Sequence, residues 1–397
     1  MLKTKDPVRK YGFLFALIYM VSYMTRINFG AVVSEMEQAT GFSKDLLSLS
    51  LTGSFITYGV GQVISGLAGD RLSPKKLISV GLAVTAGMNL LLPLCQSPYT
   101  MLSVWCVNGF AQSFMWPPIV KMLTELLTEE EYKRGTLIVS WGSSVGTVAV
   151  YLIAPAVISM WGWKWVFLLS AICAVITLVF WQGFSFSPSK VQVRKTEQGR
   201  LRGLFTPLMI GVMAAIILQG MLRDGVTTWM PSYIAETYDL SAASAILTGV
   251  IMPVFSVVCF QIAGGLYRKR LTNPLLCAGV FFGLGAVFAG TLYFVTGANA
   301  VLSVVCSALL TGCMHGVNLM LISMIPPFFK RYGITGTASG VLNSCTYIGS
   351  AASTYGIAVL SQSAGWKNTV LIWLTIAVLG AAVCLICIKP WKKQFGE

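Results

Sequence analysis

Residues 11–33 read YGFLFALIYMVSYMTRINFGAVV, a run of 23 residues in which Arg26 carries the only charge. A helix of about 20 apolar residues crosses roughly 30 Å of hydrocarbon, so the run predicts a membrane-spanning helix. It is too long for the apolar part of a cleaved signal peptide, and similar runs follow it along the chain. The presence of the charged Arg26 inside a predicted membrane span therefore requires an explanation.

The rest of the chain repeats this apolar pattern. Of its 397 residues, 55% are hydrophobic and 11% are charged, which is typical of an integral membrane protein. Gly, Pro and charged clusters separate the apolar runs. The predicted fold class is all-α, with twelve transmembrane helices at residues 11–33, 46–69, 76–95, 99–124, 135–159, 165–185, 206–231, 244–266, 273–294, 300–327, 334–360 and 367–388.

The 28 lysines and arginines are divided unevenly between the connections. Twenty-three lie in alternate connections, including both chain ends, whereas the opposite connections hold Lys44, Lys164 and Lys367. Basic residues gather on the cytoplasmic side, so we expect a multi-pass protein of the inner (plasma) membrane with both termini in the cytoplasm. The remaining two, Arg26 and Arg223, lie inside predicted spans. This distribution explains the net charge of +14 without nucleic-acid binding.

The sequence gives little support for metal, nucleotide or catalytic sites. Its ten cysteines are scattered through apolar runs as small apolar residues, and His315 is the only histidine. We therefore expect no metal site and no cofactor. A phosphate-cradling Walker loop is missing, which argues against an ATP-driven pump. No nucleophile and base stand at a recognisable spacing, so we expect the protein not to be an enzyme.

The two halves of the chain resemble each other. Arg26 and Arg223 are 197 residues apart, close to half of the chain, and basic hairpins follow the second and eighth spans, GLAGDRLSPKK (66–76) and GGLYRKRLTNP (264–274). We predict six-helix bundles at residues 1–185 and 206–397, pseudo-symmetric and joined by a cytoplasmic linker at 186–205. Such parallel repeats are typical of major facilitator transporters, whose substrate site lies near the midplane where the halves meet.

The first basic hairpin resembles the loop signature of that superfamily in Gly66, Asp70, Arg71, Lys75 and Lys76. We expect Asp70 and Arg71 to act as a gating loop, through ion pairs between helices. Within the superfamily, four stretches resemble the organophosphate:phosphate antiporter family. They are YMVSYMTRINF (19–29), NGFAQSFMWPP (108–118), GMLRDGVTTWMPSY (220–233) and GTASGVLNSCTYIGSA (336–351).

An arginine near the bilayer centre costs about 2.5 to 3.5 kcal/mol on insertion scales, so it normally faces a water-filled cavity and a partner. Asp224 is the one acid at comparable depth. Its side chain starts roughly 100° around the helix from that of Arg223, so we expect Asp224 to be a poor partner for this neighbour. Asp224 could instead reach across to Arg26. We predict that the missing partner is an anionic substrate. A static ion pair, or an arginine that reaches a lipid headgroup, stays open as an alternative.

A phosphoryl group suits two arginines, because each guanidinium binds oxyanions bidentately and two of them match a dianion. The resemblance implies that Arg26 and Arg223 bind this group from opposite halves. Tyr19 and Tyr23 share a helix face with Arg26, and the family pattern adds two more tyrosines. The predicted substrate-binding residues, besides the two arginines, are Tyr19, Tyr23, Tyr58, Gln62, Trp116, Asn318 and Tyr347.

The chain departs from the family pattern at two cationic positions. The family usually has a lysine where Gln62 stands and a histidine where Val145 stands. His315 could compensate, and Asn318 could bond a substrate hydroxyl, although either could equally be a packed polar residue. The predicted site is less positive than is usual in the family.

Three functions follow as hypotheses. The leading one is a monomeric secondary transporter that exchanges an organophosphate for inorganic phosphate by alternating access, with membrane lipid as its other partner. The alternative is proton-coupled uptake of another small organic anion, a carboxylate or sulfonate, with Asp224 or His315 in the coupling. A membrane sensor that binds the anion without transporting it is the third.

Overall fold

The computed structural model describes residues 7–184, 202–239 and 251–396, and the secondary structure in these ranges is helical. The chain divides into two compact units, which are described separately. The first unit is Met1–Thr196 with Phe329–Ser344, and the second is Glu197–Phe328 with Cys345–Glu397. Most of the linker predicted at 186–205 and the start of the span predicted at 244–266 lie outside the described residues.

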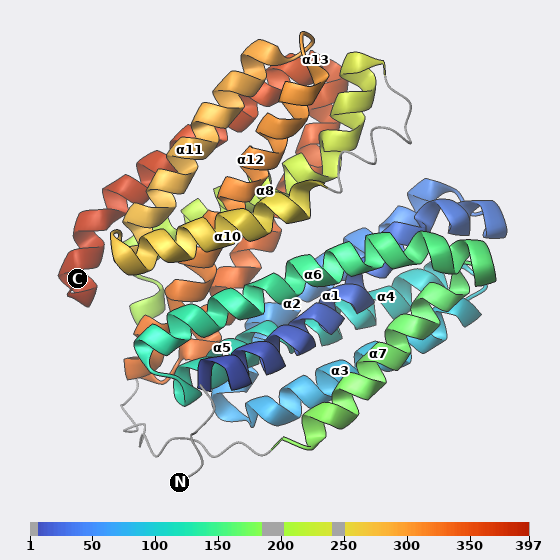
Figure 1. The fold of residues 1–397 in the computed structure, drawn as a ribbon, viewed down its shortest axis with the longest axis horizontal. Coiled ribbons are helices and arrows are strands. Elements are labelled where there is room, and N and C mark those ends of the chain that lie inside the picture. Colours follow the sequence, from blue (N-terminus) through green and yellow to red (C-terminus); the bar gives the residue numbers. More distant parts are fainter. Residues whose placement is uncertain (1–6, 185–201, 240–250, 397) are drawn as a thin grey trace. The chain divides into compact units, whose positions relative to one another are not determined.

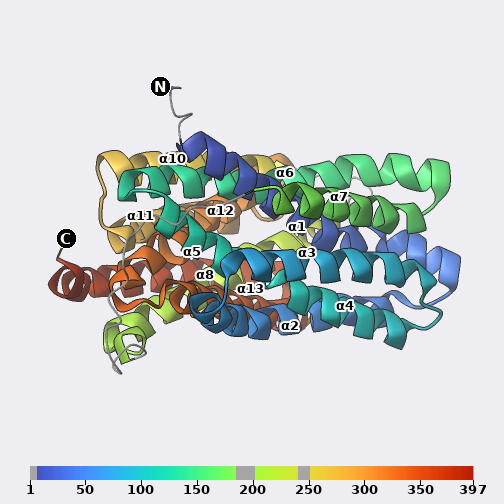
Figure 2. The ribbon, with the colours of Figure 1, turned by 90° about the horizontal axis from the view of Figure 1, so that it is seen from below.

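The first unit contains the helices of the N-terminal half, and neighbours in space are often distant in sequence. Helix α1 lies along α6, and α3 lies along α7 (Figure 1). Helices α2 and α4 also lie side by side (Figure 2). The elements are α1 (Pro7–Thr40), α2 (Lys44–Arg71), α3 (Pro74–Leu91), η1 (Leu92–Leu94), α4 (Pro98–Gln112), α5 (Trp116–Leu126), α6 (Glu129–Trp161) and α7 (Lys164–Gln182).

The second unit is built around α12, which packs against α8, α10 and α11. Its C-terminal helix α13 begins in the first unit and continues in the second from Cys345. The elements from Arg202 onward are η2 (Arg202–Leu204), α8 (Pro207–Tyr238), α10 (Ile251–Lys269), α11 (Pro274–Val295), α12 (Ala300–Asn318), the π-helical η3 (Leu319–Met324), η4 (Pro326–Tyr332) and α13 (Thr335–Phe395).

Ten helices in the described ranges are long and apolar enough to cross a membrane. Three predicted spans take another form. The span at 99–124 is divided into α4 and α5, because Pro117 and Pro118 have no N–H to donate to the carbonyls four residues earlier. The last two spans are joined as α13, which changes direction at Gly365, where φ is 79° and ψ is 167°. The predicted all-α fold is confirmed, with these local differences.

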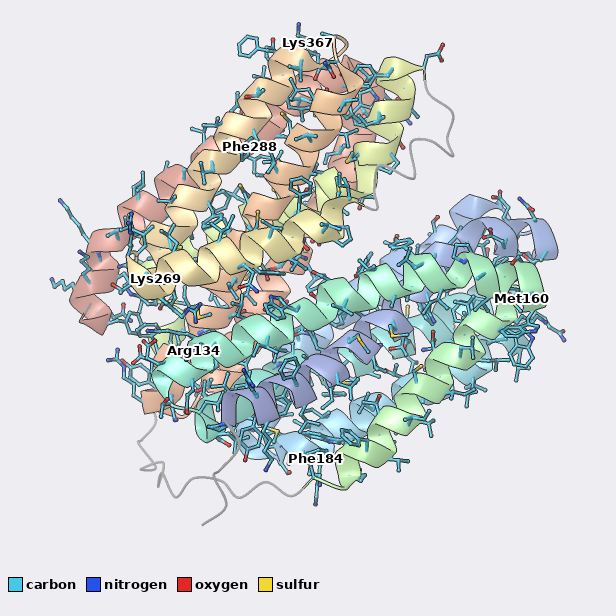
Figure 3. All side chains as sticks on the ribbon, in the orientation of Figure 1. Arg134, Met160, Phe184, Lys269, Phe288 and Lys367 are labelled. Carbon is cyan, nitrogen blue, oxygen red and sulfur yellow. The ribbon has the colours of Figure 1, made fainter. Side chains whose placement is uncertain are left out.

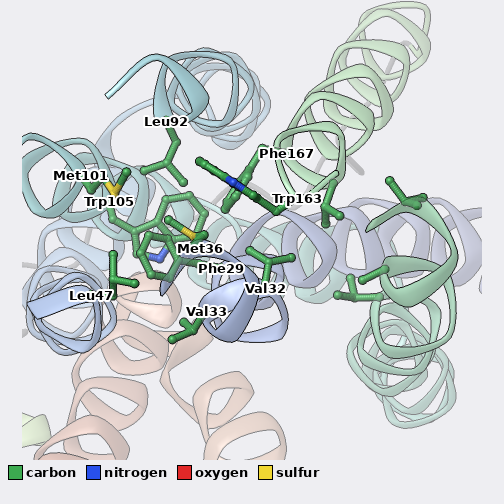
Figure 4. Close-up of a cluster of buried hydrophobic side chains, with 14 residues drawn as sticks. Phe29, Val32, Val33, Met36, Leu47, Leu92, Met101, Trp105, Trp163 and Phe167 are labelled. Atoms are coloured by element: carbon green, nitrogen blue, oxygen red, sulfur yellow. The ribbon is translucent and has the colours of Figure 1, made fainter. Parts of the chain in front are cut away.

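Helix α1 is held close to its neighbours on both sides of Arg26. Before it, a Cβ atom added at Gly142 or Gly146 of α6 would overlap the backbone carbonyls of Ala16 and Met20. After it, the ring of Phe29 lies 5.1 Å from Trp105 and 6.1 Å from Phe167, in a buried apolar cluster (Figure 4). Close packing of this kind fixes the position of the turn that carries Arg26.

Four labelled residues show where the predicted connections lie in each unit (Figure 3). Arg134 and Met160 lie at the two ends of α6, and Lys269 and Lys367 lie at opposite ends of the second unit (Figure 3). Arg134 and Lys269 belong to the connections for which a cytoplasmic position is predicted, and Lys367 belongs to the other set. The sidedness of the membrane protein stays a prediction.

Candidate functional site

The guanidinium of Arg26 lies against two aromatic rings in the first unit. Its Cζ atom is 4.2 Å from the ring centre of Tyr23 and 4.7 Å from that of Tyr58, and the residue is only 7% exposed. The face of an aromatic ring attracts a cation electrostatically, most strongly where water is excluded. The two rings therefore orient the guanidinium and stabilise its charge in a buried position.

Two further aromatic residues extend this group. The ring of Tyr19 lies 5.0 Å from that of Tyr23 and 4.9 Å from that of Trp116. Tyr19, Tyr23 and Arg26 share one face of α1 because their spacing matches two helical turns. Five of the six residues that the sequence predicts for the first half of the site, all except Gln62, lie in this one cluster of α1, α2 and α5 side chains. That they bind substrate remains a prediction.

A buried polar network, which the sequence analysis missed, supports α1 beside this cluster. Ser22 Oγ donates to Gln112 Oε1 at 2.5 Å, and Gln112 Nε2 donates to Thr25 Oγ1 at 2.8 Å. The carbonyl of Thr25 accepts from Asn108 Nδ2 at 3.1 Å and from Asn89 Nδ2 at 3.2 Å. Polar residues inside apolar spans are the signal that could have revealed it. The network links α1, α3 and α4 at the turn that precedes Arg26.

Gln62 stands where the family usually has a lysine, and it is fully buried. Its Oε1 accepts from Nδ2 of Asn343, in the part of α13 that belongs to the first unit, at 3.0 Å. Its Nε2 is buried without a hydrogen-bond partner among the described residues. Gln62 also lies one turn after Tyr58 on α2, so its amide donor lies near the ring that contacts Arg26.

In the second unit, Arg223 is paired with the residue that follows it. Arg223 Nε donates to Asp224 Oδ1 at 2.6 Å, and Nη2 donates to Asp224 Oδ2 at 2.8 Å. The prediction that Asp224 is a poor partner for its neighbour is therefore wrong. The side chains start far apart around α8, but the long arginine stem folds back and presents its planar fork to both carboxylate oxygens. That Asp224 could also reach Arg26 stays a prediction.

Residues of α12 and α13 surround this pair. Ser350 Oγ donates to Asp224 Oδ2, and His315 interacts electrostatically with both Arg223 and Asp224. The His315 ring packs edge-on against Phe260, 5.4 Å away. The predicted coupling residues, Asp224 and His315, are thus together in one cluster with Arg223.

The two remaining predicted site residues of the second half are near this cluster in sequence. Asn318 is the last residue of α12, one turn after His315, and it is half-buried. Tyr347 precedes Ser350 by one turn on α13 and is also half-buried. Their positions are compatible with the predicted roles, which stay predictions.

Asp70 has a different partner from the one predicted for the gating loop. Its Oδ1 accepts from the backbone N–H of Gly336 at 2.8 Å, and its Oδ2 accepts from the N–H and Oγ1 of Thr337, both at 2.7 Å. A carboxylate suits the start of α13, where N–H groups lack intrahelical partners and the helix dipole is positive. Asp70 thus contacts a helix N-terminus instead of a basic side chain, and Arg71 is exposed.

A sequence profile described as the Major Facilitator Superfamily matches residues 15–354. The chain belongs to the Major Facilitator Superfamily. Its fold agrees with this family: the solved structure of the proton:xylose symporter XylE bound to 6-bromo-6-deoxy-D-glucose matches 98% of this chain and 96% of that one, with a TM-score of 0.77 and 14% identity. The chain is therefore an integral membrane transporter and not an enzyme.

Relatives within the superfamily include two that are named for organophosphate transport and one that is named a membrane sensor protein. "Probable hexose phosphate transport protein" of Chlamydia trachomatis serovar D is 22% identical over 92% of this chain and 88% of its own length. "Membrane sensor protein UhpC" of Salmonella typhimurium is 21% identical, over 94% and 89%. "Glycerol-3-phosphate transporter" of Bacillus subtilis is 23% identical, over 84% and 81%. These relatives confirm the predicted resemblance to the organophosphate transport family.

Proposed function

We propose that this superfamily member transports a small organic phosphate across the inner membrane by alternating access and exchanges it for inorganic phosphate. It works as a monomer with both termini in the cytoplasm. Each unit contributes one arginine to the phosphoryl group, Arg26 from the first and Arg223 from the second. The substrate lowers the energy of the occluded state more than that of either open state, which speeds reorientation of the loaded carrier.

The observation that carries this proposal is the aromatic setting of Arg26. A guanidinium held against two tyrosine rings, at 4.2 and 4.7 Å, is a preorganised cation in a buried place. Ring contacts stabilise the charge through the ring face and do not neutralise it. A planar guanidinium oriented in this way suits the bidentate binding of a phosphoryl group. The relatives, which are named for hexose phosphate and glycerol-3-phosphate transport, support the same substrate class.

The test combines binding with flux, since one relative is named a membrane sensor protein. Purified protein is screened by thermal shift against inorganic phosphate, glycerol 3-phosphate, glucose 6-phosphate, carboxylates and sulfonates. A ligand at one hundred times its Kd stabilises the folded state by about 2.7 kcal/mol. Proteoliposomes are then assayed for uptake of the best ligands, with and without internal phosphate.

We expect stabilisation by phosphates and uptake that internal phosphate accelerates. Stabilisation by carboxylates or sulfonates alone would contradict the phosphate assignment. Binding without flux would indicate the sensor function instead. Uptake driven by an imposed pH gradient, with no effect of internal phosphate, would favour the proton-coupled alternative.

A further inference from the structure

The pair of Arg223 and Asp224 has the geometry that an oxyanion ligand would adopt. Two parallel N–H···O bonds of 2.6 and 2.8 Å join the guanidinium to both carboxylate oxygens. A phosphoryl group can bind bidentately to this same edge of an arginine through the same kind of bond. The carboxylate of Asp224 therefore occupies donors on Arg223 that a phosphate ligand would need.

Contacts between α8 and α13 hold the carboxylate in this position. Ser350 of α13 donates to Asp224 Oδ2, on the oxygen that also accepts from Arg223. The two helix backbones approach closely here, since a Cβ atom at Gly220 would overlap the carbonyl of Thr346 and one at Gly349 that of Ile217. Ser350 thus presents its hydroxyl to Asp224 where the two helices pack closely.

The pair is not completely buried. The side chain of Arg223 is 13% exposed and that of Asp224 is 31% exposed. His315 lies within electrostatic range of both side chains. Part of each side chain is therefore uncovered, and Ser350 and His315 give the carboxylate further polar neighbours.

We propose that Asp224 is an intramolecular counter-anion that binds Arg223 in the empty carrier and gives up this arginine to the phosphoryl group of the substrate. This inference rests on the proposed function, and it predicts the balance between phosphate exchange and net transport. A desolvated arginine without a partner is far more costly than a paired one, and an empty carrier must close over its site before it can reorient. With Asp224 in place the empty carrier returns, so exchange with phosphate is the faster mode but net transport also occurs.

The experiment compares exchange with net flux in proteoliposomes that contain the full-length protein. Vesicles loaded with radiolabelled inorganic phosphate are diluted into buffer with phosphate, which measures exchange, or without it, which measures net efflux. The variants are Asp224→Asn, which keeps the shape but not the charge, and Ser350→Ala. The matched control is Glu236→Gln, which removes an exposed acid from the same helix. Phosphate binding is followed by thermal shift.

For Asp224→Asn we expect exchange at or above the wild-type rate, net efflux lowered about ten-fold, and phosphate bound about ten-fold more tightly, because a competing like charge is removed. Ser350→Ala should also lower net efflux and tighten phosphate binding, each by a smaller factor. Glu236→Gln should change neither net efflux nor phosphate binding. Wild-type net efflux in Asp224→Asn would overturn the proposal, as would loss of exchange in protein that still binds phosphate.

Two features keep the test decisive. Should Asp224→Asn fail to fold, Ser350→Ala carries the test alone, and unchanged net efflux in this variant would overturn the proposal. Failure of the proposed function gives a different result, because the wild-type protein would then show neither phosphate stabilisation nor phosphate exchange.

Discussion

The two intramembrane arginines occupy matching places in the repeat but have different surroundings. Arg26 lies against the rings of Tyr23 and Tyr58, which stabilise a cation and leave its charge in place. Arg223 is bonded through both ends of its fork to Asp224, which cancels its charge. The repeat in the sequence predicts equal roles for the two arginines. Ring faces thus hold the first arginine, and a carboxylate that a ligand displaces under the proposal above holds the second.

Replacing each arginine with lysine is the strongest test of this difference. In Arg26→Lys, phosphate exchange should fall at least about one hundred-fold, because an ammonium group cannot reproduce the bidentate fork or its stacking on the rings. In Arg223→Lys the loss should be about ten-fold, since a lysine keeps a point-charge pair with Asp224. The measurement is kcat/KM for exchange in proteoliposomes.

The control for these variants is Arg134→Lys, at an exposed arginine near the start of α6, which should exchange at the wild-type rate. Equal losses in Arg26→Lys and Arg223→Lys would show that the two arginines act alike. The asymmetry between the units would then have no functional meaning.

Removing Arg223 alone, and then together with Asp224, should show whether the two residues compensate each other's charge. Arg223→Ala should lower the free energy of unfolding by about 2 kcal/mol, because it leaves a carboxylate without its counter-ion in a partly buried place. The double variant Arg223→Ala/Asp224→Ala should recover at least half of this loss. Thermal unfolding in detergent gives both values, and Glu236→Ala is the control. A double variant that is no more stable than Arg223→Ala would contradict a mutually compensating pair.

The first half of the candidate site could be predicted well because its geometry is local. Tyr19, Tyr23 and Arg26 lie on one helix, and the period of 3.6 residues alone puts them on one face. Tyr58 and Trp116 came from the family resemblance, and the structure places both beside the α1 residues. Helix periodicity and a motif together were sufficient for this cluster.

The second half could not be predicted from helix periodicity. Angular spacing along α8 separates Arg223 from Asp224, but it ignores the reach of a long side chain and the hydroxyl that Ser350 brings from α13. Asp70 was likewise predicted to pair with a basic residue, whereas its partners are backbone N–H groups at the start of α13. The first difference comes from the reach of a side chain within α8, and the second comes from a tertiary contact with α13. Angular spacing along one helix predicts neither.

The ring contacts of Arg26 can be tested separately from the tyrosine hydroxyls. Tyr58→Leu removes the ring and should raise the KM for phosphate about ten-fold, whereas Tyr58→Phe keeps the ring and should raise it no more than about two-fold. The control Tyr151→Leu, at an exposed tyrosine of α6, should leave KM unchanged. An effect of Tyr58→Phe as large as that of Tyr58→Leu would mean that the hydroxyl, and not the ring face, is the important group.

The smallest expected effect is a change in ligand preference with pH, and it distinguishes a counter-anion from a proton carrier at Asp224. A phosphate monoester loses its second proton near about pH 6, so it is mainly a monoanion at about pH 5 and a dianion at about pH 7.5. Repulsion between Asp224 and the ligand grows with the ligand's charge. The gain in glycerol 3-phosphate affinity in Asp224→Asn should therefore be about ten-fold at the higher pH and about three-fold at the lower.

Thermal-shift titrations of wild type and Asp224→Asn at the two pH values measure the ratio of their affinities for glycerol 3-phosphate. Methanesulfonate, a monoanion throughout this range, is the control ligand, and its ratio should not change with pH. A proton carrier behaves in the opposite way, because substitution would matter most where Asp224 takes up its proton, and uptake driven by a pH gradient would be lost in Asp224→Asn. If the gain in affinity is larger at the lower pH and uptake driven by a pH gradient is lost in Asp224→Asn, Asp224 acts in proton coupling and not as a counter-anion.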